Sequence, residues 1–596
     1  MTINILLEKA ICDTLKALFD FDLATSAVLL QPTRKEFDGS HTFVVFPYTK
    51  LSKVSPEETG KIIGEHLLQT VPQVASYNVV KGFLNFVIKD SFWINTLQDI
   101  VLDKTFGNHA ANGQKVMVEY SSPNTNKPLH LGHLRNNFLG FSVANILQAN
   151  GYEVIKANLV NDRGVHICKS MLAYQKFGNG ETPESSGLKG DHLAGKYYVE
   201  FDKALKAQNA TLETAGWSAE DIEKKNPMLL EAQDMLLKWE QGDKEVVDLW
   251  KKMNAWVYDG FNKTYKTMGV SFDKFYYESD TYLLGKEVVE EGLKSGVFFK
   301  KDNGSVWIDL TAEGLDEKLV LRGDGTSVYI TQDMGTAELK YKEFGINKSV
   351  YVVGNEQDYH FVVLKHIMKK LGRPYADGIY HLSYGMVDLP SGKMKSREGT
   401  VVDADDLMQE MITTAGEHTA ALGKIDDFTP EQAQQLYTTL GMGALKYFLL
   451  KVDPKKRMLF NPQESIEFQG HTGPFIQYTH ARICAILRKA ASMGHQDFTS
   501  LTFNINKLEN CEKEVIIALS QFPDKIKEAG DEYAPSVIAN YIFELAKDYN
   551  RFYNEVSVFN EPDQEVFMFR IAFSGAVASV IKKGMLLLGI DVPEKM

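Results

Sequence analysis

The stretch VMVEYSSPNTNKPLHLGHLRNNFLGFSVANILQANGYEVIKANL, residues 116–159, decides the expected fold. Its first apolar run, Val116–Tyr120, is typical of a buried strand, and a polar loop, Ser121–His130, follows it. Apolar residues then recur at helical spacing from Gly132 to Ala149, and an Asn-Gly pair ends the helix. Because Tyr152–Leu159 is again a predicted strand, this order indicates the first crossover of a parallel nucleotide-binding sheet.

A second crossover is predicted further along the chain. Ser349–Val353 is a predicted strand, Tyr359–Lys370 a helix and Tyr380–Leu389 another strand. The polar, charged segment from about Gly178 to Lys244 has the composition of an insertion between the two crossovers. The predicted fold class is therefore α/β, a Rossmann-type parallel sheet in two halves, with ligands bound at the carboxyl ends of the strands where the halves meet.

The segments on either side of this sheet differ from it in character. For the first ~110 residues we predict a small α+β domain. Its helices are Ile3–Phe19 and Pro56–Thr70, its strands are Thr42–Pro47 and Gly82–Ile88, and Phe106–Gln114 is a linker. After about Met458 strand signals nearly vanish, and we predict four helices: Gly473–Ala491, Glu512–Lys527, Ala534–Val556 and Glu565–Leu588. We therefore expect domains at 1–110 and 111–457, with an insertion near 178–270, and an all-α bundle at 458–596.

Composition restricts the class of protein. The formal net charge of −13 counts against a general nucleic-acid binder, so an RNA partner would need local basic patches and shape recognition. No uncharged apolar stretch approaches the ~20 residues that cross a bilayer, and the N-terminus lacks a secretory-signal pattern, so no membrane association is expected. The cysteines show no C-x-x-C spacing, which argues against zinc or disulfides and favours a cytoplasmic setting: Cys12, Cys168, Cys484 and Cys511.

Two motifs carry the expected chemistry. His130-Leu131-Gly132-His133 lies at the start of a predicted helix, where unpaired N–H groups and the helix dipole favour phosphate and where a glycine lets a ring approach the backbone. The second motif, Gly392–Gly399, reads GKMKSREG and follows the last predicted strand of the sheet. Such a basic loop is suited to place Lys393 against charge that develops during phosphate chemistry, although a solvated basic loop is the more common reading of this pattern alone.

Together, HLGH and KMKSR resemble the HIGH and KMSKS signatures of the class I aminoacyl-tRNA synthetases, in order and in context. The flanking residues resemble the arginine enzymes of that class in several stretches: Ser122–Asn124, Asn161–Gly164, Tyr329–Asp333, Gln357–His360 and Gln477–Arg482. The resemblance implies ATP-dependent attachment of L-arginine to tRNA(Arg) via arginyl-adenylate, with release of AMP and pyrophosphate. It also implies an N-terminal domain for the tRNA elbow, a C-terminal anticodon-binding bundle and a monomer.

The resemblance also assigns the ATP site. Four residues are expected to be catalytic: His130, His133, Lys127 and Lys393. Six more are expected to bind ATP: Gly132, Lys395, Ser396, Arg397, Gly354 and His360. Ser396 stands where KMSKS has its second lysine, and we expect Lys127 to supply the missing positive charge. Mg²⁺ is expected with ATP, held mostly by phosphates and water, and the chain itself is expected to hold no metal.

Arginine sets clear demands on its pocket, because the paired donors of a guanidinium require carboxylate acceptors. The resemblance assigns six residues to arginine: Glu278 and Asp333 with Tyr329 beside them, Ser122 and Asn124 at the amino-acid end, and Gln357. A pocket of buried acceptors rejects neutral side chains by ~10⁴ or more, so we expect no editing activity in the inserted segment.

For tRNA contact we predict seven residues: Lys456, Arg457, Tyr478, Arg482, Asn550, Arg551 and Tyr553. Packed core aromatics and solvated basic runs explain any single one of them equally well. Three alternative functions are weighed. The first is a different class I synthetase, such as the cysteine or glutamate enzyme, of which the cysteine enzyme would need zinc ligands. The second, a small-molecule nucleotidyltransferase, would lack the C-terminal helices, and the third, a non-catalytic tRNA-binding paralogue, would not need both intact loops.

Overall fold

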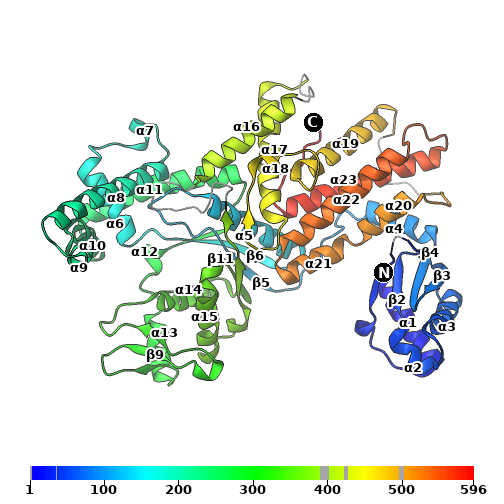
Figure 1. Cartoon of the computed structure of the whole chain (residues 1–596), viewed down its shortest axis with the longest axis horizontal. Coiled ribbons are helices and arrows are strands. Elements are labelled where there is room, and N and C mark those ends of the chain that lie inside the picture. Colours follow the sequence, from blue (N-terminus) through cyan, green and yellow to red (C-terminus); the bar gives the residue numbers. More distant parts are fainter. Residues whose placement is uncertain (1–2, 35, 389–401, 422–426, 496–502) are drawn as a thin grey trace. The chain divides into compact units, whose positions relative to one another are not determined.

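The protein is described by a computed structural model that covers residues 3–34, 36–388, 402–421, 427–495 and 503–596 (Figure 1). The chain forms two compact units. One comprises residues 107–482, 524–543 and 581–596, and the other comprises residues 1–106, 483–523 and 544–580. This division follows packing and differs from the predicted domains at 1–110, 111–457 and 458–596, whose boundaries stay a prediction.

The larger unit is built on a five-stranded sheet with the order β12-β11-β5-β6-β7. Its strands all pair in parallel: β5 (Lys115–Glu119), β6 (Glu153–Val160), β7 (Lys274–Tyr277), β11 (Lys348–Gly354) and β12 (Ile379–Tyr384). The chain runs outward from β5 in one half and from β11 in the other, so the switch point lies between these two neighbours. The predicted α/β fold in two halves is confirmed, with both crossovers at the expected places.

Two helices follow the strands that flank the switch point. The helix α5 (Leu131–Ala149) connects β5 with β6, and α15 (Asp358–Lys370) connects β11 with β12. Fourteen of the nineteen residues of α5 are buried, so this helix is covered by neighbouring parts of its unit. Among these neighbours is α17 (Pro430–Leu450), whose Tyr447 is also fully buried. The start of α5 is therefore held inside a rigid core.

The predicted strand Tyr380–Leu389 is wrong as a single strand. It divides into β12 and the short β13 (Val387–Asp388), which pairs with β14 (Met458–Leu459) in a separate two-stranded sheet. Gly385 lies at the break, where a Cβ atom would come within 2.6 Å of the Arg457 backbone nitrogen. The chain leaves the sheet here to pack against another segment, which local strand propensity does not reveal.

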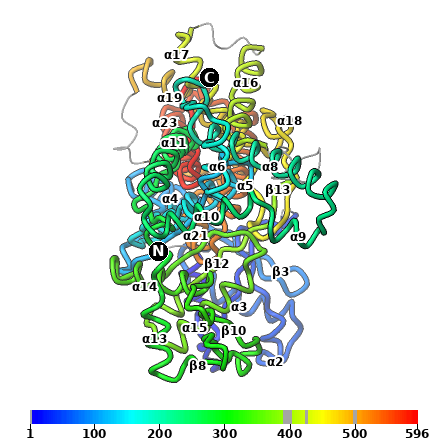
Figure 2. The backbone as a smooth tube through the Cα atoms, turned by 90° about the vertical axis from the view of Figure 1, so that its left-hand side faces the viewer, coloured from blue at the N-terminus to red at the C-terminus, as the bar shows by residue number. Residues whose placement is uncertain are grey.

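Two segments are inserted into the larger unit. The first is helical and lies beside α6 (Val165–Phe177); it contains α8 (Gly190–Thr214), α9 (Ala219–Lys225), α10 (Pro227–Glu240) and α11 (Lys244–Met268) (Figure 1 and Figure 2). The second is a three-stranded antiparallel sheet that sequence analysis missed: β8 (Phe299–Lys300), β9 (Val306–Ile308) and β10 (Lys318–Leu321). It precedes α14 (Tyr329–Phe344), which packs on α15.

The smaller unit contains the N-terminal region. Its antiparallel sheet has the order β1-β2-β4-β3: β1 (Leu30–Pro32), β2 (His41–Val44), β3 (Val74–Val80) and β4 (Phe83–Ile88). The helices α1 (Ile3–Phe19) and α3 (Pro56–Thr70) have the predicted bounds. The predicted strand Thr42–Pro47 is too long, because a 3₁₀ turn begins at Phe46, and β1 and β3 were not predicted.

The helices of the C-terminal region are α19 (Gly473–Ser492), α20 (Asn510–Ser520), α21 (Phe522–Glu532), α22 (Pro535–Glu555) and α23 (Gln564–Leu587). The predicted helix Glu512–Lys527 is two helices, because Pro523 cannot continue the first one. Among the described helices, α23 alone has the length and composition to cross a membrane. It is mostly buried, and its Arg570 forms a 2.8 Å ion pair with Glu512, as in the core helix of a folded domain.

Candidate active site at the switch point

The loop after β5 is held across both halves of the sheet. Ser121 and Ser122 have φ angles of 78° and 44°, so the chain turns sharply as the strand ends. The Ser121 backbone N–H donates to the Asn136 side-chain oxygen at 2.6 Å, and the Asn136 amide donates to the Val352 carbonyl of β11 at 2.7 Å. The loop then pairs with the end of β6 through a bridge between Asn124 and Asn161. The predicted switch point thus positions Ser122 and Asn124.

Residues 130–133, here called the histidine turn, form a reciprocal cap at the start of α5. Gly132 donates its backbone N–H to His130 Nδ1 at 3.1 Å, and His130 donates its own to His133 Nδ1 at 3.2 Å. The two ring centroids are 4.0 Å apart. A Cβ atom at position 132 would lie 3.0 Å from the His130 ring, so the glycine leaves room for this arrangement.

Burial keeps both imidazoles neutral. Burial first, and the charge of Lys127 second, lower the pKa of His130 to about 4. Burial, with the neighbouring His130 and Lys127, lowers the pKa of His133 well below its usual value. Because each Nδ1 accepts a backbone hydrogen bond, each neutral ring carries its proton on Nε2. The histidine turn therefore presents two neutral N–H donors beside a helix N-terminus, an arrangement suited to phosphate.

Lys127 lies just before the turn and is half-buried. Burial lowers the pKa of its ammonium group. Within the part of the chain that the structure describes, no carboxylate forms an ion pair with Lys127. Its charge is thus available to an anionic ligand in the neighbouring cavity.

The basic loop predicted to face this turn lies outside the described residues, and with it Lys393, Lys395, Ser396 and Arg397. The chain on either side of it is described. On one side, Leu131 donates its backbone N–H to the Val402 carbonyl at 3.1 Å, and Ala404 donates to the Leu129 carbonyl at 3.0 Å. On the other, Arg135 of α5 donates to the Met386 carbonyl at 3.5 Å. Both flanks of the basic loop therefore meet the first turns of α5.

A cavity of about 680 Å³ opens beside this turn. Four of the predicted residues line it: Asn124, Lys127, Glu278 and Tyr329. Sequence reasoning assigned no role to the other lining residues, among them Asn126, His166, Tyr198, Arg322 and Gln332. Ser122, Asp333 and Gln357 are not part of this lining, and Gln357 is exposed. Tyr329 is 81% exposed at the start of α14, so its ring lies at the mouth of the cavity.

Glu278 follows β7, and its backbone is fixed by a buried neighbour. Asp162 accepts hydrogen bonds from the Ser279 backbone N–H at 2.9 Å, the Ser279 hydroxyl at 2.8 Å and the Tyr258 hydroxyl at 2.8 Å. Burial raises the pKa of Glu278, and the charges of Asp162 and Asp333 raise it further, while Arg163 lowers it. The three carboxylates form a shared negative field that Arg163 opposes, and Glu278 is the member of this group that lines the cavity.

Asp333 lies on α14, and its carboxylate is hydrogen-bonded to His360 Nε2 of α15 at 2.6 Å. This links the residue predicted for arginine to one predicted for ATP. Gly354 ends β11 just ahead of His360. Beneath them, the buried Lys340 forms a 2.6 Å ion pair with Glu119, a pair that sequence reasoning missed. A signal was present, because Glu119 is the one charged residue in the apolar run Val116–Tyr120.

The residues predicted for RNA contact are spread over both units. In the larger unit, the Lys456 carbonyl accepts from Arg135 at 2.9 Å, Arg457 pairs with Asp388, and the Arg482 guanidinium lies 4.9 Å from the Tyr478 ring centroid. In the smaller unit, Tyr553 is 40% exposed beside Asn550, and Arg551 pairs with Glu514. The neighbouring Tyr549 and Phe552 are fully buried and belong to the core.

Comparison with known proteins gives a consistent result. Residues 96–461 match the family "tRNA synthetases class I (R), catalytic domain", and residues 476–596 match "DALR anticodon binding domain". The chain is 61% identical to an arginine–tRNA ligase of Amoebophilus asiaticus and 56% identical to one of Bacteroides fragilis, with 100% of each chain covered. It shares its fold with an arginyl-tRNA synthetase of Thermus thermophilus, at a TM-score of 0.80 and 24% identity with both chains fully covered.

Proposed function

The chain belongs to the arginine–tRNA ligase family of class I synthetases, and we propose that it joins L-arginine to tRNA(Arg) with ATP through arginyl-adenylate. AMP and pyrophosphate are the other products. The observation that carries this function is the full-length similarity to arginine–tRNA ligases, combined with a neutral histidine pair beside a cavity lined by Glu278. The chemistry consists of positioning and charge stabilisation more than covalent catalysis.

ATP would bind with its phosphates at the N-terminus of α5. Nε2–H groups of His130 and His133 would donate to phosphate oxygens, and the small Gly132 leaves room for the nucleotide. Gly354 and His360 would support the nucleotide from the other half of the sheet. Mg²⁺ would accompany ATP; because the turn offers donors rather than carboxylates, the ion would be held mainly by phosphates and water.

Lys127 would neutralise the departing pyrophosphate together with the basic loop. In that loop the assigned residues are Lys393, Lys395, Ser396 and Arg397. The half-buried ammonium of Lys127, in the cavity lining, supports its place in this set. Charge stabilisation of this kind acts most strongly where water is excluded.

Arginine would bind in the cavity. Glu278, which lines the cavity, would accept from its cationic groups, with Tyr329 at the mouth. Asp333, assigned to the same groups, lies outside the lining but close enough for its charge to raise the pKa of Glu278. Ser122 and Asn124 would hold the amino-acid end, so that its carboxylate meets the α-phosphorus of ATP in line, and Gln357 would hydrogen-bond to the same substrate. The shared negative field around Glu278 supports this arrangement, since a neutral side chain would leave it unpaired.

The second step needs tRNA, whose terminal adenosine would attack the adenylate through its 2′-hydroxyl. The predicted RNA contacts are Lys456, Arg457, Tyr478, Arg482, Asn550, Arg551 and Tyr553, and the N-terminal region would meet the tRNA elbow. Tyr478 and Arg482 fall within the matched anticodon-binding domain, which supports their assignment. A cytoplasmic monomer is part of this proposal.

ATP–pyrophosphate exchange tests the function directly. Each of the twenty amino acids would be assayed with and without tRNA(Arg). We expect exchange with arginine, dependent on tRNA. Exchange with another amino acid would mean that arginine is not the substrate. Absence of exchange with every amino acid would mean that the protein is a tRNA-binding relative without this activity.

A further inference from the structure

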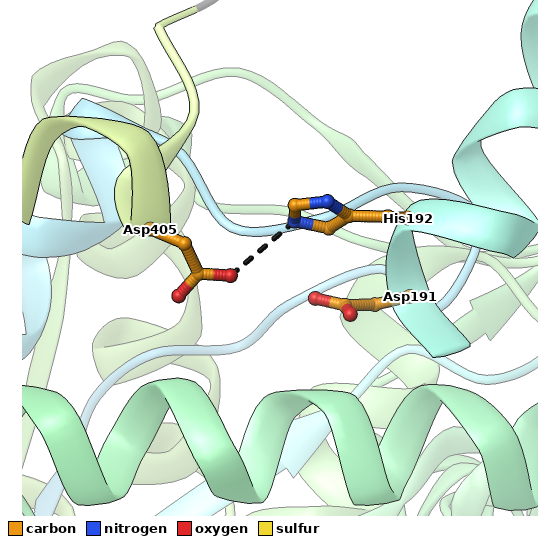
Figure 3. Close-up of side chains that lie close together, drawn as sticks. All are labelled: Asp191, His192 and Asp405. Atoms are coloured by element: carbon orange, nitrogen blue, oxygen red, sulfur yellow. Dashed lines mark ion pairs between the residues drawn. The ribbon is translucent and has the colours of Figure 1, made fainter. Parts of the chain in front are cut away.

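A group of five charged side chains lies next to the histidine turn and takes no part in the proposed chemistry. This charge cluster contains Lys189, Asp191 and His192 at the start of α8, with Asp403 and Asp405 at the start of α16 (Ala404–Ala421). His192 Nε2 lies 3.2 Å from an Asp403 oxygen and 3.3 Å from an Asp405 oxygen. The Lys189 ammonium lies 3.2 Å from Asp191 and also pairs with Asp405. Figure 3 shows His192 and Asp191 beside Asp405.

The cluster is closed on its third side by α11. Asp191 is fully buried, and a Cβ atom at Gly260 would come within 2.3 Å of its Oδ1. Thr264 donates its hydroxyl to Asp405 at 2.9 Å and accepts from Lys189 at 2.5 Å. Three helices therefore meet at these charges. Ion pairs with this degree of enclosure are screened less by water and salt than exposed ones.

The two partners His192 and Asp405 keep their charges near neutral pH. The adjacent carboxylates of Asp403 and Asp405 raise the pKa of His192 to about 10. Burial opposes ionisation of Asp405, but hydrogen bonds from His192 and Lys189 hold its pKa at about 2. Lys189 and Asp191 face the same pair from α8. Between pH 6 and 9 His192 and Asp405 therefore keep opposite charges.

A metal ion is the first alternative for such a group. The ligand atoms of Asp191, His192 and Asp405 all lie within 4.8 Å of one another. However, the Lys189 ammonium already contacts both carboxylates, and a protonated imidazole has no lone pair for a metal. The chain supplies its own cations at the place that a metal would occupy.

The cluster is connected to the histidine turn through the backbone. Asp403 forms an antiparallel bridge with His130, and the hydrogen bonds of Val402 and Ala404 on either side complete a short ladder with Leu129 and Leu131. His192 holds the Asp403 side chain, and Lys189 holds Asp405 two residues on. The inserted helix α8 is thereby tied to the backbone that carries His130.

We propose that His192 and Lys189 are positioning residues for the ATP site, which fix the Val402–Ala404 backbone and through it the histidine turn. This inference rests on the proposed role of the turn in binding ATP. Loss of the tie would move the two Nε2–H donors relative to the phosphates without changing any group that contacts them. A displacement of about 1 Å at reacting groups is enough to lower a rate by roughly 10²-fold.

The test uses the full-length chain in arginine- and tRNA-dependent ATP–pyrophosphate exchange. For His192→Ala we expect the KM for ATP to rise at least five-fold and kcat to fall about ten-fold, with the KM for arginine within two-fold of wild type. Asp403→Asn should give similar losses. The double variant should lose no more than the worse single variant, since both remove one tie. Lys224→Ala is the matched control, because it removes an exposed ion pair with Glu220 in the same inserted segment.

The outcomes separate the possibilities. If His192→Ala lowers the melting temperature but leaves both KM values and kcat unchanged, or if the two losses multiply in the double variant, the positioning role is wrong. If the wild-type protein shows no exchange, the proposed function is wrong, and the positioning role falls with it. Calorimetric titration of wild type and Asp191→Asn with Mn²⁺ and with Zn²⁺ tests the alternative; one-to-one binding that disappears in Asp191→Asn would overturn the proposal in favour of a metal site.

Discussion

The histidine turn and the arginine cavity are built in opposite ways. The turn is closed within four residues, because its two rings cap the backbone of the same helix end. The cavity is assembled from segments far apart in the chain, including the loop after β5, the start of α6 and the first turn of α14. A local structure is encoded by a short motif, whereas an assembled one depends on the register of the whole sheet. Variants should therefore affect the two regions through different kinetic constants.

The largest effect is expected in the cavity. Glu278→Gln removes a charge from the negative field beside Arg163 and with it the carboxylate that lines the cavity, one of the two assigned to the positive groups of arginine. We expect kcat/KM for arginine to fall by roughly 10³, in line with the cost of an unmatched buried polar group. The KM for ATP should stay within two-fold. Glu290→Gln on the nearby α13 (Lys286–Lys294) is the control, since its side chain is exposed. A raised KM for ATP in Glu278→Gln would mean that the cavity and the histidine turn do not act on separate substrates.

The turn gives the next largest effect. Asparagine at position 130 retains an oxygen acceptor for the Gly132 N–H but loses the Nε2–H donor. For His130→Asn we expect kcat for adenylate formation to fall by roughly 10²–10³, as for loss of a transition-state donor. The KM for arginine and the melting temperature should change little. His130→Ala, which also loses the cap, should be less stable by about 1 kcal/mol in urea unfolding. Equal stability of the two variants would mean that the cap contributes nothing.

Lys127 stands between the two regions, and its variant sharpens the comparison. Lys127→Ala should reduce adenylate formation at least ten-fold, about 1.4 kcal/mol of barrier. Its half-buried position in the cavity lining, with a lowered pKa, is the reason for this expectation. Lys127→Arg should recover part of the rate because it restores the charge. An unchanged rate in Lys127→Ala would show that Lys127 does not replace the missing loop lysine.

The contrast between local and assembled structure also explains which features could be predicted from the sequence. The strand, loop and helix around residues 116–149 were predictable because apolar spacing and a glycine-containing motif act locally. The bend at Gly385 and the antiparallel sheet of β8–β10 were not, because short segments depend on distant partners such as Arg457. Glu278 was found from a resemblance, while Arg322 and Tyr198 lack a local signal and enter the cavity only through tertiary packing.

The pH dependence of stability is the smallest expected effect, and it isolates the turn. The pKa of His130 is about 4 in the folded chain and near 6.5 when unfolded, so the unfolded state binds more protons between these values. The stability that His130 contributes is present above pH 6.5 and is lost as the pH falls toward 4. After allowance for partial exposure, we expect wild type to lose about 1 kcal/mol more than His130→Asn between pH 7 and 4.5, by urea unfolding. Parallel curves for the two proteins would mean that this imidazole is not buried as a neutral ring.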